Sequence, residues 1–299
     1  MPATLAPRVV LVTRPTELDG LLARHGTLAQ ASFFLESRGQ DVGEAIERQR
    51  SFDAALEVAG AGVPLDWRRA RVDRADLDRF LFAEGDLVVA LGQDGLVANL
   101  AKYLDGQPVI GLDPEPGRNA GVLVRHAPAD AGELLRAAAE DRVAIEERAM
   151  VEARVIAGPR VLALNEVFVG HRSHQSARYE ITIGERAERQ SSSGLIVTTG
   201  TGATGWASSI ARERADRVGL PSPTDERLAY FVREAWPGAS YGVSLTAGEL
   251  RGDARLRIVS HMEDGVLFGD GMESDRVSLS WGQPLEVSLA RERLRLVVG

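Results

Sequence analysis

A buried strand that runs directly into a polar, glycine-containing turn is the feature that most restricts the fold of this chain. The run Asp86–Leu91 is apolar after its first residue, and Gly-Gln-Asp-Gly follows it at once. The next segment, Leu96–Leu104, carries apolar side chains at helical spacing. A strand without a polar face needs cover on both sides, which is typical of a parallel sheet with helices on its two faces.

The same alternation extends through the first half of the chain. Val9–Val12 and Pro108–Leu112 are further short apolar runs, predicted as strands. Leu22–Ala59 and Asp130–Met150 are rich in Ala, Leu, Glu and Arg and are predicted as helical regions. The first half is therefore expected to form a Rossmann-like α/β domain with a mostly parallel sheet.

The pattern changes near Val151, where short β-branched runs separated by Gly and Ser begin to recur. A helix around Thr204–Arg217 interrupts them. We predict an α/β nucleotide-binding domain over residues 1–148 and a β-rich domain over residues 149–299. The last strands are candidates to return to the first domain.

Composition excludes several classes of function. The 299 residues carry a formal net charge of −8, which argues against a nucleic-acid binder that works by bulk electrostatics. The absence of cysteine rules out disulfides, thiolate metal sites and cysteine nucleophiles. No apolar run is long enough to span a membrane, and the run at Val9 is too short for a signal peptide. A cytoplasmic protein with neither a nucleic-acid nor a membrane partner is expected.

The turn Gly92–Gly95 is the first candidate site. Ligands of open parallel sheets collect at the carboxyl ends of the strands, and glycines there let backbone N–H groups approach a phosphate. Asp94 would repel a phosphate, but it could take a proton from an alcohol while Gly92 and Gly95 hold the phosphates. From this short motif alone, a plain turn in which Asp94 caps the helix is about as well supported.

Two more sites lie in the second half. The segment Thr199–Trp206 contains G-x-G-x-x-G between a predicted strand and a helix, the pattern of a dehydrogenase. Its position in the β-rich half argues against that interpretation, and its threonines suggest hydrogen bonds to a polar ligand.

Asn165 and Glu166 form a polar pair inside an apolar run, where Asn could recognise a base and Glu a sugar hydroxyl. A solvent-facing strand end is the alternative.

The order of these three motifs resembles that of the NAD kinase family, which carries GGDG, NE and TPTGSTAY-like motifs. The branch of mitochondrial-type NAD kinases and their bacterial relatives is the most similar, and the resemblance covers roughly residues 8 to 275. It implies a two-domain fold with nucleotide sites in a cleft. It also implies the reaction, transfer of phosphate from ATP to the 2′-hydroxyl of the adenosine ribose of NAD(H), giving NADP(H).

The resemblance also implies roles for residues. Asp94 corresponds to the proposed general base, and Gly92 and Gly95 to residues that line the phosphates. The dinucleotide's adenosine half would be held by Asn165, Glu166, Thr199, Thr201, Gly202 and Thr204. Asp270-Gly271 is similar to a late Asp-Gly of the family. The implied ligands are NAD(H) and ATP with Mg²⁺, and the implied assembly is a homo-oligomer, a dimer or tetramer. Arg118 and Lys102 are candidates for phosphate binding, Lys102 being the one lysine in the chain.

Several residues depart from the family pattern. Gln93 stands in place of the second glycine of GGDG, and Leu96 in place of a polar residue. A side chain at Gln93 could restrict the approach of a phosphate. A catalytically weakened or regulatory relative is therefore one alternative, and a lipid or polyol kinase of the same superfamily is another. His171 and His174 are expected to be solvated loop residues rather than metal ligands.

Overall fold

The structure, a computed structural model, describes residues 6–118, 121–214 and 218–299. The chain divides into two compact units. The first contains Met1–Glu146 together with Arg295–Gly299, and the second contains Glu147–Leu294.

A parallel sheet forms the centre of the first unit. Its strands are ordered β2-β1-β3-β4, and the final residues of β16 pair in parallel with β4. The elements in chain order are β1 (Arg8–Thr13), α1 (Glu17–His25), α2 (Leu28–Glu36), α3 (Gly43–Gly62), β2 (Arg68–Asp73), η1 (Arg74–Asp76), β3 (Asp86–Leu91), α4 (Asp94–Ala101), β4 (Pro108–Leu112), η2 (Pro128–Asp130) and α5 (Ala131–Ala139).

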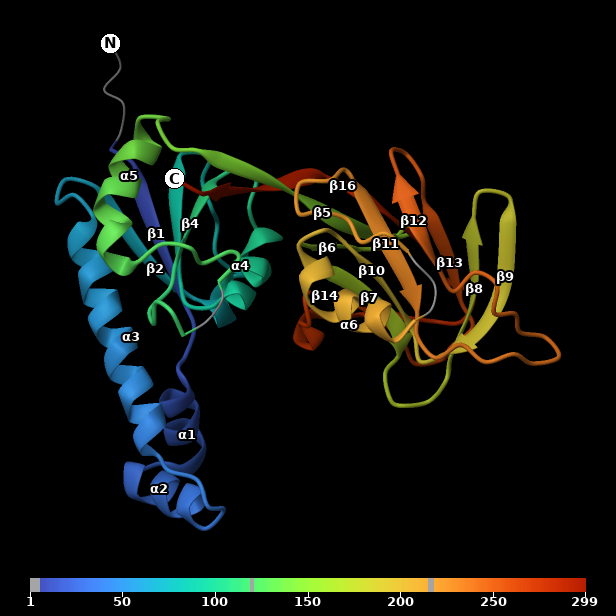
Figure 1. Ribbon diagram of the computed structural model, residues 1–299, viewed down its shortest axis with the longest axis horizontal. Coiled ribbons are helices and arrows are strands. Elements are labelled where there is room, and N and C mark those ends of the chain that lie inside the picture. Colours follow the sequence, from blue (N-terminus) through green and yellow to red (C-terminus); the bar gives the residue numbers. More distant parts are fainter. Residues whose placement is uncertain (1–5, 119–120, 215–217) are drawn as a thin grey trace. The chain divides into compact units, whose positions relative to one another are not determined.

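Helices cover this sheet on both faces. Figure 1 shows α3 and α5 on one side of the strands and α4 on the other. Phe52 of α3 and Leu135 of α5 share a core with Leu91 of β3, while Leu96 and Leu100 of α4 are fully buried. Every residue of β3 is buried, as expected for a strand covered on both faces. The predicted α/β fold with a mostly parallel sheet is confirmed.

The region Leu22–Ala59 is not continuously helical. It contains the end of α1, all of α2 and most of α3. Gly26, with a φ of 80°, ends α1, and Gly39, with a φ of 70°, lies just after α2. Thr16 and Thr27 begin α1 and α2 by accepting a backbone N–H with their side chains.

The predicted helix over Asp130–Met150 is wrong in its second half. Helix α5 ends at Ala139, and Asp141 has a left-handed φ of 51°. The strand β5 (Ile145–Val155) then pairs with β6 and β16. Its Ala, Glu and Arg content favours a helix, but pairing with the neighbouring β6 and the distant β16 overrides that local preference.

The second unit is a β-sandwich. Its elements after β5 are β6 (Arg160–Ala163), β7 (Glu166–His171), β8 (Ala177–Ile183), β9 (Arg186–Ser192), β10 (Leu195–Thr198), η3 (Gly202–Thr204), α6 (Trp206–Glu213), β11 (Arg227–Val232), β12 (Ala247–Arg251), β13 (Leu256–Ser260), β14 (Gly265–Gly269), η4 (Glu273–Asp275), β15 (Val277–Leu279) and β16 (Pro284–Val297). The end of the helix predicted around Thr204–Arg217 lies outside the described residues.

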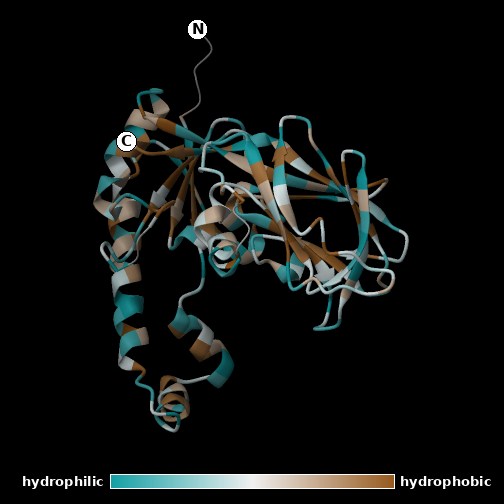
Figure 2. Cartoon of the chain, turned by 45° about the vertical axis from the view of Figure 1, so that its right-hand side comes forward, coloured by the Kyte–Doolittle hydropathy of each residue, from teal (hydrophilic) through white to brown (hydrophobic). Residues whose placement is uncertain are grey.

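One sheet of the sandwich is entirely antiparallel, with the order β12-β11-β10-β7-β14-β15. Its inner face, with Val167, Val169 and Val197, packs on Tyr179 and Ile258 of the other sheet. Figure 2 shows hydrophobic residues concentrated along these strands and hydrophilic ones along the connecting loops. Helix α6 packs on the outer face, against Ile196 and Phe231. No helix in the described ranges is long and apolar enough to cross a membrane.

Candidate active site

The polar turn after β3 begins helix α4. Gln93 is the N-cap residue and Asp94 the first helical residue. The backbone of Gln93 has φ −104° and ψ 167°, an extended conformation that any residue can adopt. A Cβ on Gly95 would meet no atom within 4 Å, so the turn is open beside it. The glutamine therefore introduces no backbone strain at this position.

The Asp94 carboxylate holds a loop from a distant part of the chain. Its Oδ2 accepts the backbone N–H of Val122 at 2.9 Å, and its Oδ1 accepts those of Leu123 and Val124 at 2.8 and 3.0 Å. A carboxylate has about four acceptor directions, so about one remains for a ligand. Asp94 is thus fixed in orientation and can still receive one further proton donor.

Gly111 lets the same loop lie against β4. A Cβ on this residue would come 2.1 Å from the carbonyl oxygen of Leu123. The carbonyl oxygen of Gly111 accepts the backbone N–H of His126 at 3.2 Å. The position of the loop, and with it that of the Asp94 carboxylate, depends on a glycine at residue 111.

We expect Gly111→Ala to destabilise the protein by about 2–3 kcal/mol, because the added methyl group overlaps backbone that is fixed by Asp94. Gly60→Ala is the matched control, since residue 60 lies in α3 with nothing within 4 Å of its Cβ position. It should be neutral or stabilise by about 0.5–1 kcal/mol. Urea midpoints measure both effects. Equal midpoints for the two variants would contradict this description of the loop.

A small pocket of about 100 Å³ opens at the carboxyl ends of β1, β3 and β4. Arg14, Arg48 and Gln93 contribute to its lining. The Arg14 guanidinium donates to Oε1 of Gln93 at 2.7 Å. Burial lowers the pKa of Arg14, and the nearby charge of Arg74 lowers it further. Arg14 is thus a cation at the ligand-binding edge of the sheet, one that sequence reasoning missed among so many arginines.

The two predicted phosphate ligands lie differently. Lys102 follows the carboxyl end of α4. At a rise of 1.5 Å per residue it lies about 12 Å from Asp94 along the helix axis. Its Nζ is 5.2 Å from the ring centroid of Tyr103. Arg118 forms ion pairs with Glu44 and Glu115. Arg118 would therefore have to exchange these carboxylates for a phosphate, and Lys102 does not lie at the turn that holds Asp94.

In the second unit, Asn165 lies between β6 and β7, and Glu166 begins β7. The side chain of Asp270 accepts the backbone N–H of Leu164 at 2.9 Å and of Asn165 at 2.6 Å. The N–H of Asp270 donates to the carbonyl oxygen of Glu166 at 3.0 Å. The structure therefore brings together the Asn-Glu pair and the late Asp-Gly, which are separated by more than a hundred residues.

Glu166 has an unusual protonation equilibrium. Burial raises the pKa of its carboxyl group to about 7, and the negative charge of Asp270 contributes to the rise. None of the described residues donates a hydrogen bond to this carboxyl group. Glu166 is thus a carboxyl group that changes charge near neutral pH at a candidate site, a combination common in functional residues.

The Gly/Thr-rich turn wraps around the backbone of the Asn-Glu pair. The Thr199 hydroxyl donates to the carbonyl oxygen of Leu164 at 2.5 Å and accepts the N–H of Thr201 at 3.1 Å. The Thr204 hydroxyl donates to the carbonyl oxygen of Thr201 at 3.0 Å. Thr199 and Thr204 therefore shape the turn, whereas the hydroxyl of Thr201 donates no hydrogen bond within the described turn.

The glycines of this turn permit close packing. A Cβ on Gly200 would come 1.8 Å from the carbonyl oxygen of Ser222, and one on Gly202 would come 2.3 Å from that of Asn165. The strand before the turn, β10, is antiparallel to both of its neighbours. A dinucleotide fingerprint belongs to a parallel βαβ unit, so the geometry excludes a dehydrogenase fold here.

Comparison with known proteins places this geometry in a family. No model of a protein family matches the chain. A curated relative, NAD kinase 2, mitochondrial, from Rattus norvegicus, is 30% identical over 262 residues, which cover 71% of this chain. The chain belongs to the NAD kinase family. It spans 62% of the length of that relative. The family inferred from the three motifs is confirmed.

Solved structures of NAD kinases share the fold. The NAD kinase from Archaeoglobus fulgidus in complex with ATP has a TM-score of 0.59 at 17% identity, and 97% of this chain and 93% of that one are covered. Yeast NADH kinase complexed with NADH has a TM-score of 0.62 at 14% identity, with 99% and 84% covered. Identities this low support the shared architecture alone.

One further residue of this NAD kinase family member lies near the motifs but outside them, Arg148. It is fully buried, and its Nη1 donates to the Thr201 hydroxyl at 3.4 Å. Sequence reasoning misses Arg148, because this residue lies in Asp130–Met150, the segment expected to be helical. A buried guanidinium beside the Gly/Thr turn adds a positive charge to a group of otherwise neutral and acidic residues.

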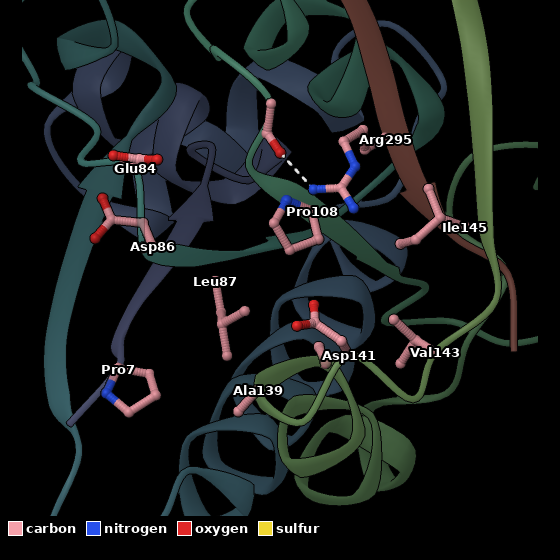
Figure 3. Close-up of a pocket in the computed structure, with 13 residues that line it drawn as sticks. Pro7, Glu84, Asp86, Leu87, Pro108, Ala139, Asp141, Val143, Ile145 and Arg295 are labelled. Atoms are coloured by element: carbon pink, nitrogen blue, oxygen red, sulfur yellow. Dashed lines mark hydrogen bonds between the residues drawn. The ribbon is translucent and has the colours of Figure 1, made fainter. Parts of the chain in front are cut away.

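Another pocket, of about 340 Å³, lies at the amino ends of the strands in the first unit. Figure 3 shows Asp86, Asp141 and Arg295 in its wall. Asp86 is paired with Arg8, and Arg295 donates to the carbonyl oxygen of Gly106 at 2.9 Å. Ligands of parallel sheets gather at the opposite, carboxyl ends of the strands, so this pocket is not part of the candidate site.

Proposed function

We propose that the chain transfers a phosphoryl group from ATP to the 2′-hydroxyl of the adenosine ribose of NAD or NADH, giving NADP or NADPH. The observation that carries the proposal is the Asp94 carboxylate, held by three backbone N–H groups at the carboxyl end of a buried parallel strand. A carboxylate fixed in this way can accept the proton of a hydroxyl as the new P–O bond forms.

The turn around Asp94 supports phosphate binding in this reaction. Gly95 is exposed and leaves the backbone accessible near the first turn of α4, whose N–H groups favour an anion, whereas Gly92 is buried against Leu96. Phosphoryl transfer depends mainly on positioning and on stabilisation of charge. Mg²⁺, when bound with ATP, neutralises the charge that develops on the transferred group. We expect this Mg²⁺ to be held chiefly by the phosphates.

Residues of the second unit would hold the acceptor. Asn165 can recognise the edge of the adenine base, and the ionised Glu166 can accept a hydrogen bond from a ribose hydroxyl. Thr201, Gly202 and Thr204 would complete the pocket, with Thr199 holding the turn in shape. Arg148 would counter the charge of a phosphate near Thr201. The roles of the Asn-Glu pair and of the Gly/Thr turn follow the family motifs residue by residue, whereas that of Arg148 rests on its contact with Thr201.

The conformation of Gln93 favours a competent enzyme over a weakened or regulatory relative. Its backbone is extended, and its side chain bonds to Arg14 instead of covering the open side of Gly95. The departure from GGDG therefore changes a side-chain contact without a strained turn.

The test is turnover. Purified protein is incubated with ATP, Mg²⁺ and NAD or NADH, and NADP(H) is quantified with an NADP-specific dehydrogenase. Polyphosphate in place of ATP identifies the donor. We expect NADP(H) to form, with phosphate on the 2′ position by ³¹P NMR. Binding of NAD without any product would instead support the regulatory alternative.

A further inference from the structure

A pocket of about 510 Å³ lies at one end of the β-sandwich in the second unit. We call it the histidine pocket, because three of the five histidines in the chain, His171, His174 and His261, line it. His171 is the last residue of β7, five residues or about 17 Å along the strand from Glu166. The histidine pocket is therefore separate from the Asn-Glu pair and from the candidate active site.

Several segments that are joined to one another form the walls of this pocket. The N–H of His261 donates to the carbonyl oxygen of Arg178 at 2.9 Å, and that of Arg172 donates to the carbonyl oxygen of Asp264 at 2.9 Å. The His261 ring is stacked with the Trp281 ring, with centroids 5.2 Å apart and planes inclined by 22°. The pocket is thus built from loops that are fixed to the ends of the strands.

The His171 ring is held in one tautomer. Its Nδ1 accepts the backbone N–H of Ser173 at 3.1 Å. Because this nitrogen accepts, the proton of the neutral ring is on Nε2, which is then a hydrogen-bond donor. A ring in this state offers an N–H to a ligand and has no lone pair left for a metal ion. His171 therefore suits an anion better than a cation.

The charge of the pocket depends on its histidines. Arg178, Glu263 and Asp264 also line it, and all three are exposed. None of the three has an oppositely charged side chain within 4.0 Å in the part of the chain that the structure describes. With neutral imidazoles, one guanidinium opposes two carboxylates. With His174 and His261 charged, three cations oppose the same two carboxylates. Since histidine changes its charge between pH 5 and 8, the net charge of the pocket changes sign over this range.

We propose that the histidine pocket is an anion-binding site that fills as the pH falls, and that it takes a small dianionic group. Arg178 supplies a permanent charge and His171 a donor, while His174 and His261 add charge only in acid. The inference does not depend on the proposed reaction. The titratable and charged side chains that line the pocket, among the described residues, are His171, His174, Arg178, His261, Glu263 and Asp264.

The experiment measures binding of sulfate by titration calorimetry at pH 5.5 and pH 8, at constant ionic strength. Sulfate is the probe because it stays a dianion throughout this range. It should bind about tenfold or more tightly at pH 5.5, the effect of one added charged hydrogen bond. Arg178→Gln should weaken binding about tenfold or more at both pH values. Arg186→Gln, which removes an exposed arginine from β9, should bind like the wild type.

The ring signals of the histidines in NMR spectra give an independent readout. By linkage, a ligand that prefers a charged imidazole raises the pH at which that ring gives up its proton. Sulfate should therefore move the titrations of His174 and His261 to higher pH. His25 and His126, which lie in the first unit, are internal controls and should titrate as before.

Four results would overturn the proposal. These are the absence of saturable sulfate binding at pH 5.5, equal affinities at the two pH values, equal affinities of Arg178→Gln and Arg186→Gln, and a common shift of all five histidines. The last would show general screening by salt instead of a site. Glu263→Gln supplies a test of the opposite sign. Because it removes one of the two opposing carboxylates, it should strengthen sulfate binding at pH 8, and unchanged or weaker binding would contradict the charge balance described above.

Discussion

Asp94→Asn should lower the rate of NADP formation by about 10²- to 10⁴-fold, the usual range for loss of a general acid or base. The amide has a single acceptor oxygen, and it cannot take a proton from the ribose hydroxyl. Where Oδ2 receives the N–H of Val122 at 2.9 Å, an NH₂ group would face another donor. The loop that holds the site would loosen as well, at a cost of about 1–3 kcal/mol.

Two measurements separate these effects. The free energy of unfolding reports the loop, and kcat for NADP formation reports the chemistry. Asp66→Asn is the control, because it removes the same charge from an exposed position in the same unit. If Asp94→Asn kept full turnover, Asp94 would not accept the proton, and its three hydrogen bonds would make it a structural residue only.

Glu166→Gln should make the protein more stable than the wild type at pH 8–9, by about 3 kcal/mol at 1.36 kcal/mol per pKa unit. In the folded protein, burial raises the pKa of Glu166 from 4.5 to about 7. Between these values the folded state keeps a proton that the unfolded state has lost, so wild-type stability falls as pH rises. Above about pH 7 the full cost of the buried charge is present.

Urea midpoints at pH 5 and pH 8.5 measure this difference, which should be small at pH 5. Glu185→Gln, an exposed carboxylate of the same unit, should change neither midpoint appreciably. If Glu166→Gln were no more stable than the wild type at pH 8.5, its carboxylate would not be buried beside Asp270 as described.

The same substitution should change the pH profile of turnover. If the ionised Glu166 holds the ribose hydroxyl, wild-type kcat/KM for NAD rises with pH and levels off above about pH 7. Glu166→Gln should remove this rise and lower kcat/KM at pH 8 by about 10- to 100-fold, the cost of a charged hydrogen bond. An unchanged rise in the variant would assign the titration to another group.

The sequence was sufficient to predict a parallel sheet, because strands like β3 are apolar throughout and end in a turn that starts a helix. It was insufficient for β5. Its local composition favours a helix, and its strand conformation comes from pairing with β6, which follows after a short turn, and with β16, which follows much later in the chain. Strand pairing between distant segments leaves no mark in local residue spacing.

The candidate site divides in the same way. The turn containing Asp94 and the Asn165–Glu166 pair could be found by their polar residues in apolar surroundings. The loop at Val122–Val124 could not, since it is apolar. The resemblance pointed to Asp270-Gly271, but not to the hydrogen bonds that join Asp270 to the backbone of Leu164 and Asn165. The raised pKa of Glu166 arises from burial and from Asp270, two properties that only the folded chain possesses.

The most direct test of the central claim is the rate of NADP formation from ATP and NAD by the wild-type protein and by Asp94→Asn, prepared in parallel. We expect steady NADP formation that requires both substrates and Mg²⁺. We also expect a loss of at least a hundredfold in the variant, at the lower end of the range for a general base. No NADP from a folded wild-type protein that binds NAD, or equal rates for the two proteins, would contradict it.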